Sequence, residues 1–141
     1  MIHGLWVIKK TGECIFEKFF EMPKSGPDIS NLLTAIQTFA NSISGNSVRS
    51  ITLENMLFRY KLSRDVFFVL FIDKEDEVSE TLDSIEVKFW TEFKQPITKK
   101  ENKKEIEKFA EEVDKIIKIY QNKKEIEDLD NKLRSIEREL I

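Results

Sequence analysis

Two residue types that often act in catalysis occur only once in this chain of 141 residues: His3 is its one histidine and Cys14 its one cysteine. A Ser-His-Asp arrangement or an activated cysteine needs a histidine beside the nucleophile. A zinc site of the usual kind needs several His or Cys ligands. We therefore interpret His3 and Cys14 as structural residues. We expect no enzyme activity and assign no catalytic or metal-binding residue.

An acidic run, Asp73-Lys74-Glu75-Asp76-Glu77, is the remaining candidate for cation binding. Acids just before a helix also complement the positive end of its dipole, and we favour that interpretation. Phosphate binding is not indicated, because no glycine fits a GxxxxGK[ST] loop. The sequence therefore predicts no cofactor, and the chain is not expected to be a GTPase itself. The four glycines are Gly4, Gly12, Gly26 and Gly45.

Charge is unevenly distributed along the chain. From Ile97 onward there are 12 basic and 12 acidic residues, out of 23 and 26 in the whole chain, so residues 1–96 carry the net charge of −3. This pattern does not favour nucleic-acid binding, which needs clustered positive charge. No stretch has the ~18 consecutive apolar residues of a membrane span.

The lone cysteine excludes an internal disulfide and suits a reducing compartment. The opening segment MIHGLWVIKK lacks the basic start and the cleavage site of a signal peptide. We therefore expect a cytoplasmic protein that would reach membranes only through its partners.

Hydrophobic patterning predicts five strands and three helices. Apolar runs at Ile2–Lys9 and Asp65–Asp73 are typical of strands covered on both faces, and Gly12 predicts a tight turn. Spacings of three and four residues predict helices from about Asp28 to Ile43, after Asp73, and after a capping box at Thr98 and Glu101. The other predicted strands are Glu13–Phe20, Ser47–Leu53 and Met56–Leu62.

The apolar spacing slips near the end of the chain. Tyr120 and Ile126 are six residues apart where the earlier register predicts seven, so the segment either turns away there or presents a rotated face. Its apolar face can fold back on the domain, pair with another copy or dock on a different protein. We therefore divide the chain into a domain, 1–120, and a C-terminal amphipathic helical extension, 121–141. The candidate partner-binding residues of this extension are Ile126, Leu129, Leu133, Ile136 and Leu140.

The expected fold is α+β: a five-stranded antiparallel sheet sandwiched by helices, in the order β-β-α-β-β-β-α-α, followed by the extension. This order resembles that of longin domains, on the segments IHGLWVIKKTGECIFEKFF, DISNLLTAIQTFANSI and SVRSITLENMLFRYKLSRDVFFVLFID. Such domains occur in SNAREs, small adaptin subunits, TRAPP subunits and archaeal proteins. The resemblance covers roughly residues 1–120. It implies a platform that dimerises with itself or with another longin or roadblock protein, and that engages small GTPases in vesicle trafficking.

The predicted function is that of a non-catalytic adaptor or scaffold. If Glu13–Phe20 is a sheet edge, a partner strand can pair with it, and Ile15, Phe16, Phe19 and Phe20 are candidate contacts. These side chains can equally fill the core. Two alternatives remain: a structural subunit held by its C-terminal helix, or a profilin-like or PAS-like sensor. In the sensor, Trp6, Phe67, Phe68 and Phe71 would line the ligand pocket.

Overall fold

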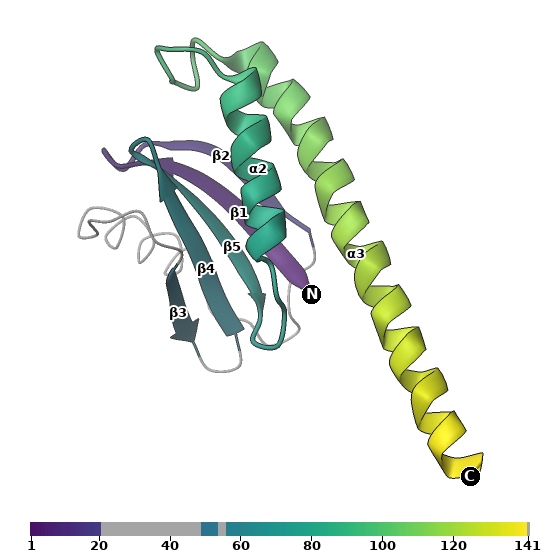
Figure 1. Cartoon of the computed structure of the whole chain (residues 1–141). Helices are drawn as coiled ribbons and strands as arrows, with labels where there is room; N and C mark the ends of the chain where they lie inside the picture. Colours follow the sequence, from purple (N-terminus) through teal and green to yellow (C-terminus); the bar gives the residue numbers. More distant parts are fainter. Residues whose placement is uncertain (21–48, 54–55, 141) are drawn as a thin grey trace.

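A computed structural model describes residues 1–20, 49–53 and 56–140. One antiparallel sheet has the strand order β2-β1-β5-β4-β3, and two helices follow it in the chain (Figure 1). The strands are β1 (Ile2–Lys9), β2 (Cys14–Phe19), β3 (Arg49–Leu53), β4 (Met56–Ser63) and β5 (Val66–Asp73); the helices are α2 (Ser79–Glu92) and α3 (Lys103–Leu140).

Tight turns join neighbouring strands. Gly12, in the β1–β2 turn, has a φ of 99°, as the sequence predicts. Arg64 and Asp65 join β4 to β5 with φ values of 49° and 63°. Two successive positive φ angles match the twist of the flanking strands and close a two-residue hairpin.

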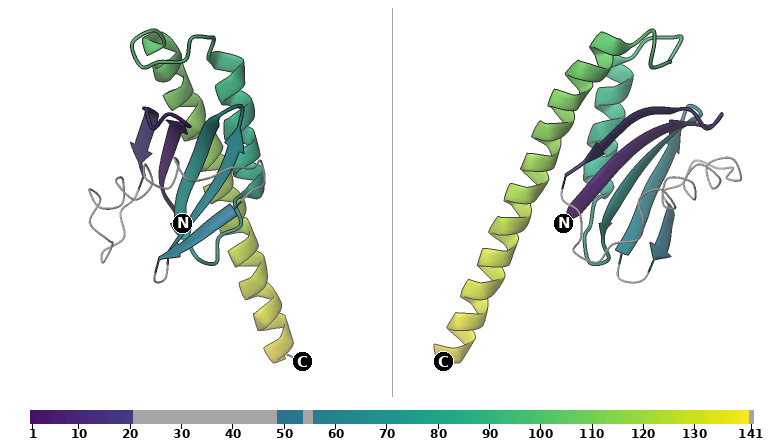
Figure 2. Two further views of the ribbon diagram at one scale, coloured as in Figure 1. Left: turned by 90° about the vertical axis from the view of Figure 1, so that its left-hand side faces the viewer. Right: turned by 180° about the vertical axis from the view of Figure 1, so that it is seen from behind.

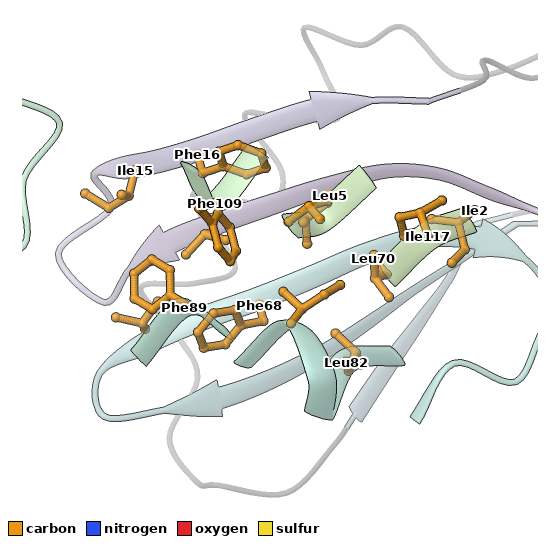
Figure 3. Packing of buried hydrophobic residues seen from close by; sticks show 14 of the residues in the cluster. Ile2, Leu5, Ile15, Phe16, Phe68, Leu70, Leu82, Phe89, Phe109 and Ile117 are labelled. Atoms are coloured by element: carbon orange, nitrogen blue, oxygen red, sulfur yellow. The ribbon is translucent and has the colours of Figure 1, made fainter. Parts of the chain in front are cut away.

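The central strand β5 and its neighbour β1 are buried on both faces. Residues 2–8 of β1 and 66–72 of β5 are buried without a break. Apolar side chains that point to one face, such as Leu5, Phe68 and Leu70, pack against the helices (Figure 3). Those that point to the other face, such as Trp6 and Phe71, form a second cluster with β4. The prediction that both strands are covered on both faces is confirmed.

Both described helices lie on the same face of the sheet, side by side (Figure 2). Leu82, Ile85 and Phe89 bury one side of α2 in the helix-facing core. Lys61 of β4 adds a polar link, donating to Asp83 at 2.7 Å and to Glu86 at 3.0 Å.

The predicted fold class is wrong in its order of elements. The described elements run β-β-β-β-β-α-α in two layers, with no helix of the described residues on the second face. The predicted helix from Asp28 to Ile43 and the loop before it lie outside the described residues. Helix α3 passes Tyr120 without interruption, so the predicted C-terminal helical extension continues the helix that precedes it. The slip in apolar spacing changes which face of the helix is apolar and introduces no residue that breaks a helix.

Candidate interaction surface on helix α3

The first half of α3 is fixed to the domain by apolar contacts. Phe109, Val113 and Ile117 are buried in the helix-facing core. The Phe109 ring lies 5.0 Å from that of Phe16 in β2 and 5.5 Å from that of Phe89 in α2 (Figure 3). These edge-to-face contacts join α3 to both the sheet and α2.

A buried carboxylate makes the last link between α3 and the domain. The Asp76 side chain, in the β5–α2 loop, is fully buried. It accepts hydrogen bonds from the Tyr120 hydroxyl at 2.5 Å, from the Lys124 ammonium and from the N-terminal ammonium of Met1. Two donors from α3 and one from the N-terminus therefore meet on one acid.

Burial and hydrogen bonding oppose each other in setting the pKa of Asp76. Burial alone would raise this pKa, but hydrogen bonds from Lys124, Met1 and Tyr120 more than offset it and hold the pKa below its usual value. The pKa of Lys124 is raised, because the bond to Asp76 outweighs the opposing effect of burial. Burial and the bond to Asp76 also raise the pKa of Tyr120. The acid is therefore ionised and paired at neutral pH.

Beyond Lys124, α3 projects away from the sheet (Figure 1). Lys124 is the most C-terminal α3 residue, within the described part of the chain, that forms an ion pair with the domain. Residues 125–140 continue the helix for about 24 Å. An isolated helix of this length is marginal in water, so its stability depends on what else it contacts.

The projecting part carries a stripe of exposed apolar side chains. Their exposed fractions are 68% for Ile126, 59% for Leu129, 53% for Leu133 and 52% for Ile136. Ile119, seven residues before Ile126, is 67% exposed and continues the stripe toward the domain. We call these five residues the α3 seam. Their spacing is that of the a and d positions of a coiled coil, with Asn122 at the remaining position.

The α3 seam points away from the domain. Ile119 comes two residues after the buried Ile117, and Ile126 two residues after Lys124. Two residues turn a helix by ~200°, so Ile119 and Ile126 each lie ~160° around the axis from that domain-facing neighbour. Leu129, Leu133 and Ile136 continue the same stripe at heptad spacing. Of the two alternatives left open by the sequence, the structure shows the rotated face.

The structure brings together four of the five predicted C-terminal residues, Ile126, Leu129, Leu133 and Ile136. Leu140 lies in α3, and its side chain is outside the described residues. Sequence reasoning missed Ile119, because the C-terminal stripe was predicted to begin only after Tyr120. The heptad spacing back from Ile126 was the signal that identifies it.

The predicted β2 residues do not form one surface. β2 lies at an edge of the sheet, where strand pairing is geometrically possible. Ile15 and Phe16 are buried under the helices, and Phe20 packs partly against the same core. Phe19 is 38% exposed and contacts Trp6 edge-to-face at 5.6 Å. Both Ile15 and Phe16 can face the helices because the register shifts between them, Val7 pairing with Phe16 and Ile8 with Cys14.

The surroundings of His3 and Cys14 fit structural roles for both side chains. The His3 ring is buried, with Nε2 2.8 Å from a carboxylate oxygen of Asp73. Burial, followed by the charge of Glu17, raises the pKa of the Cys14 thiol. A reactive cysteine needs the opposite shift, toward the thiolate.

The acidic run is used within the fold. Asp76 binds α3 and the N-terminus as described above. Glu77 accepts hydrogen bonds from the backbone N–H of Ser79 at 3.0 Å and from its hydroxyl at 2.5 Å, at the start of α2. Within residues 1–20, 49–53 and 56–140, no group of three or more His, Cys, Asp or Glu side chains is placed to hold a metal ion.

The aromatic residues proposed for a sensor pocket lie in two different layers. Trp6, Phe67 and Phe71 belong to the cluster on the second face, whereas Phe68 faces the helices. All four are at most 2% exposed. They therefore fill the core on both sides of the sheet and do not line a common pocket.

A groove of about 620 Å³ lies elsewhere, between the start of α2 and α3. Its lining combines Ile116, Ile119 and Tyr120 with charged residues that include Asp76 and Lys124. The groove adjoins the α3 seam at Ile119, so apolar surface continues from the groove onto the projecting helix.

Comparisons with known proteins add no relative. The sequence matches no protein-family model and no curated protein. Among the described helices, none combines the length and apolar character needed to cross a membrane.

Proposed function

We propose that this chain is a non-catalytic protein-interaction module, an adaptor or scaffold that binds its partners through the α3 seam. One observation carries the proposal: a helix anchored at one end presents five apolar side chains, each more than half exposed, on the face away from its own domain. Exposed apolar side chains in a contiguous stripe mark surfaces that bind another molecule. Heptad spacing specifies another helix as the binding element.

The anchoring contacts support this role. Apolar packing around Phe109 and the Asp76 cluster hold α3 at a defined angle to the sheet. The projecting end is therefore presented in one orientation. A presented helix loses less conformational entropy on binding than a free segment, which favours affinity.

The test compares three forms of the full chain, each immobilised and exposed to lysate of the source organism. The seam variant carries Leu129→Glu and Leu133→Glu. The control carries Asn131→Glu and Ser135→Glu, which also add two glutamates to α3. Both positions are exposed and lie on the side of the helix opposite the seam. We expect mass spectrometry to identify proteins retained by wild type and control and lost from the seam variant. If all three forms retain the same proteins, the α3 seam is not the binding surface.

The resemblance to longin domains adds small GTPases and trafficking regulators as partners within this proposal. That part rests on the resemblance alone. Recovery of a small GTPase, or of another longin or roadblock protein, by wild type and control supports it. Titration of the purified pair by calorimetry then measures the affinity, and no heat of binding would refute the pairing.

A further inference from the structure

We propose that the α3 seam pairs with the seam of a second copy of this chain, antiparallel, with Ile126 opposite Leu129 of the second copy. This inference rests on the proposed function and names one partner for the same surface. The argument uses the charged residues that flank the seam, because these decide between helix orientations that bury similar apolar surface.

Heptad positions place seven exposed charged residues beside the seam. Ile119, Ile126 and Leu133 take position a, and Leu129 and Ile136 take position d. The g positions then hold Lys118, Glu125, Lys132 and Glu139, and the e positions hold Lys123, Asp130 and Glu137. The sign of the charge alternates along the g edge and changes once along the e edge, so the pairing depends on direction and register.

A parallel pair in register brings each g residue near the e residue five positions later in the other chain. Lys118 then meets Lys123, and Glu125 meets Asp130. Both contacts repel, and each occurs twice in a symmetric pair. Only Lys132 with Glu137 attracts, so the parallel arrangement is disfavoured by charge.

An antiparallel pair brings g residues near g residues and e residues near e residues. With Ile126 opposite Leu129, the two-fold axis passes between Glu127 and Asp128. Every flanking contact between two charged residues then joins opposite charges, and each occurs twice, while Glu137 lies opposite Ile116. The pairs are Lys118 with Glu139, Glu125 with Lys132, and Lys123 with Asp130.

The same register buries the whole seam. Ile119 lies opposite Ile136 of the second copy, and Asn122 lies opposite Leu133. The alternative antiparallel register, with Leu129 opposite Leu133, leaves Ile119 uncovered. It also places Lys132 opposite Lys132 and Asp130 opposite Asp130 of the second copy, so that both pairs repel. Charge and apolar burial therefore select the same arrangement.

The second copy would approach α3 from the side on which the seam residues are exposed. The seam lies on the side of α3 away from its domain, and Ile119 is 67% exposed where the end of the second helix would lie. The two domains would stand at opposite ends of the paired helices. The result is an elongated dimer with one sheet domain at each end.

Single charge reversals distinguish the two directions, because they act with opposite sign. Glu125→Lys places lysine against Lys132 in the antiparallel pair, but against Asp130 in the parallel pair. Asp130→Lys likewise places lysine against Lys123 in the antiparallel pair, where the two repel, but against Glu125 in the parallel pair, where they attract. We expect each reversal to weaken the dimer on the order of tenfold. Adding Lys132→Glu to Glu125→Lys should restore wild-type affinity.

Sedimentation equilibrium of the full chain measures these dissociation constants. Asp128→Lys, an equal charge change at an exposed position away from the seam, is the control and should leave affinity unchanged. Tighter dimers with Glu125→Lys and Asp130→Lys would overturn the inference in favour of parallel pairing. A monomer at all concentrations would overturn self-pairing.

A distance measurement provides an independent test. Cys14 is first replaced by alanine and a spin label is attached at Arg138→Cys. The antiparallel register separates the two labels by about 31 Å along the axis, whereas a parallel pair places them at the same height. A short label distance would overturn the inference. The capture experiment with the seam variant separates this inference from the proposed function. If the chain does not pair with itself but the seam variant still loses its captured partners, the proposed function stands. If the seam variant retains those partners, the proposed function is refuted as well.

Discussion

Replacing Asp76 with asparagine tests whether the buried acid holds α3 in place. The substitution keeps the size of the side chain and an acceptor for the Tyr120 hydroxyl. It removes the negative charge that faces the Lys124 and Met1 ammonium groups. We expect a lower free energy of unfolding and faster hydrogen exchange in the part of α3 around Lys124.

The expected loss in the free energy of unfolding follows from the exposure of the two ammonium groups that Asp76 contacts. Leaving a buried polar partner unsatisfied costs ~1–3 kcal/mol. The side chain of Lys124 is 33% exposed and that of Met1 is 46% exposed, so water can solvate both groups once the charge is gone. We therefore expect a loss of about 1–2 kcal/mol at pH 7, in the lower half of that range.

The loss should depend on pH in a defined direction. The pKa of Asp76 is lower in the folded chain than the ~3.9 of an unfolded aspartate. Its contribution to stability is therefore fully present above that value and disappears as the pH falls through the folded pKa. The difference between wild type and Asp76→Asn should be constant from pH 5 to 7 and shrink at lower pH.

Urea denaturation of both proteins across this pH range measures the difference. Asp83→Asn is the matched control, because its side chain is 59% exposed and Lys61 keeps Glu86 as a partner. The control should change the free energy of unfolding by less than ~0.5 kcal/mol. Equal stability of Asp76→Asn and wild type at pH 7, or a difference that grows as the pH falls, would refute the reasoning.

Three further predictions concern the core that supports the surface. Phe109→Ala should lower the free energy of unfolding by ~3–5 kcal/mol in urea denaturation, because the ring is fully buried. The control Val87→Ala, at a residue 62% exposed, should change the free energy of unfolding by less than ~0.5 kcal/mol. Losses of equal size in the two variants would contradict the packing of Phe109. Gly4→Ala should destabilise the sheet, since its new Cβ would lie 3.2 Å from the Trp6 ring and 3.4 Å from a backbone oxygen; an unchanged melting temperature would show that the ring can move. Cys14 should react with a thiol reagent more slowly than free cysteine at pH 7.5, because its pKa is raised; faster labelling would contradict this.

Local sequence patterns located most of the elements. Consecutive apolar residues in Ile2–Lys9 identified an inner strand, and the polar Ser47–Leu53 segment identified a strand that the structure places at the sheet edge. Such patterns predict elements because the period of a strand or a helix is a property of the backbone and decides which side chains share a face. The same relation between spacing and face predicts the rotated apolar stripe after Tyr120.

The sequence did not determine how the elements are combined. It led to a wrong order of elements, because β1 and β5 are apolar on both faces and carry no signal for which face the helices cover. The extension was predicted to begin at residue 121 because the apolar spacing slips there. The structure shows that α3 continues through this point, since a change of apolar face does not interrupt backbone hydrogen bonding.

The sequence by itself determined that α3 has an apolar heptad stripe near its end, since spacing along one helix is a local property. Only the tertiary structure decided that this stripe faces away from the domain. That orientation depends on Asp76, whose partners Lys124 and Met1 are 48 and 75 residues distant in the chain. Contacts over such separations leave no periodic trace in the sequence, because they form only after the sheet and helices have packed.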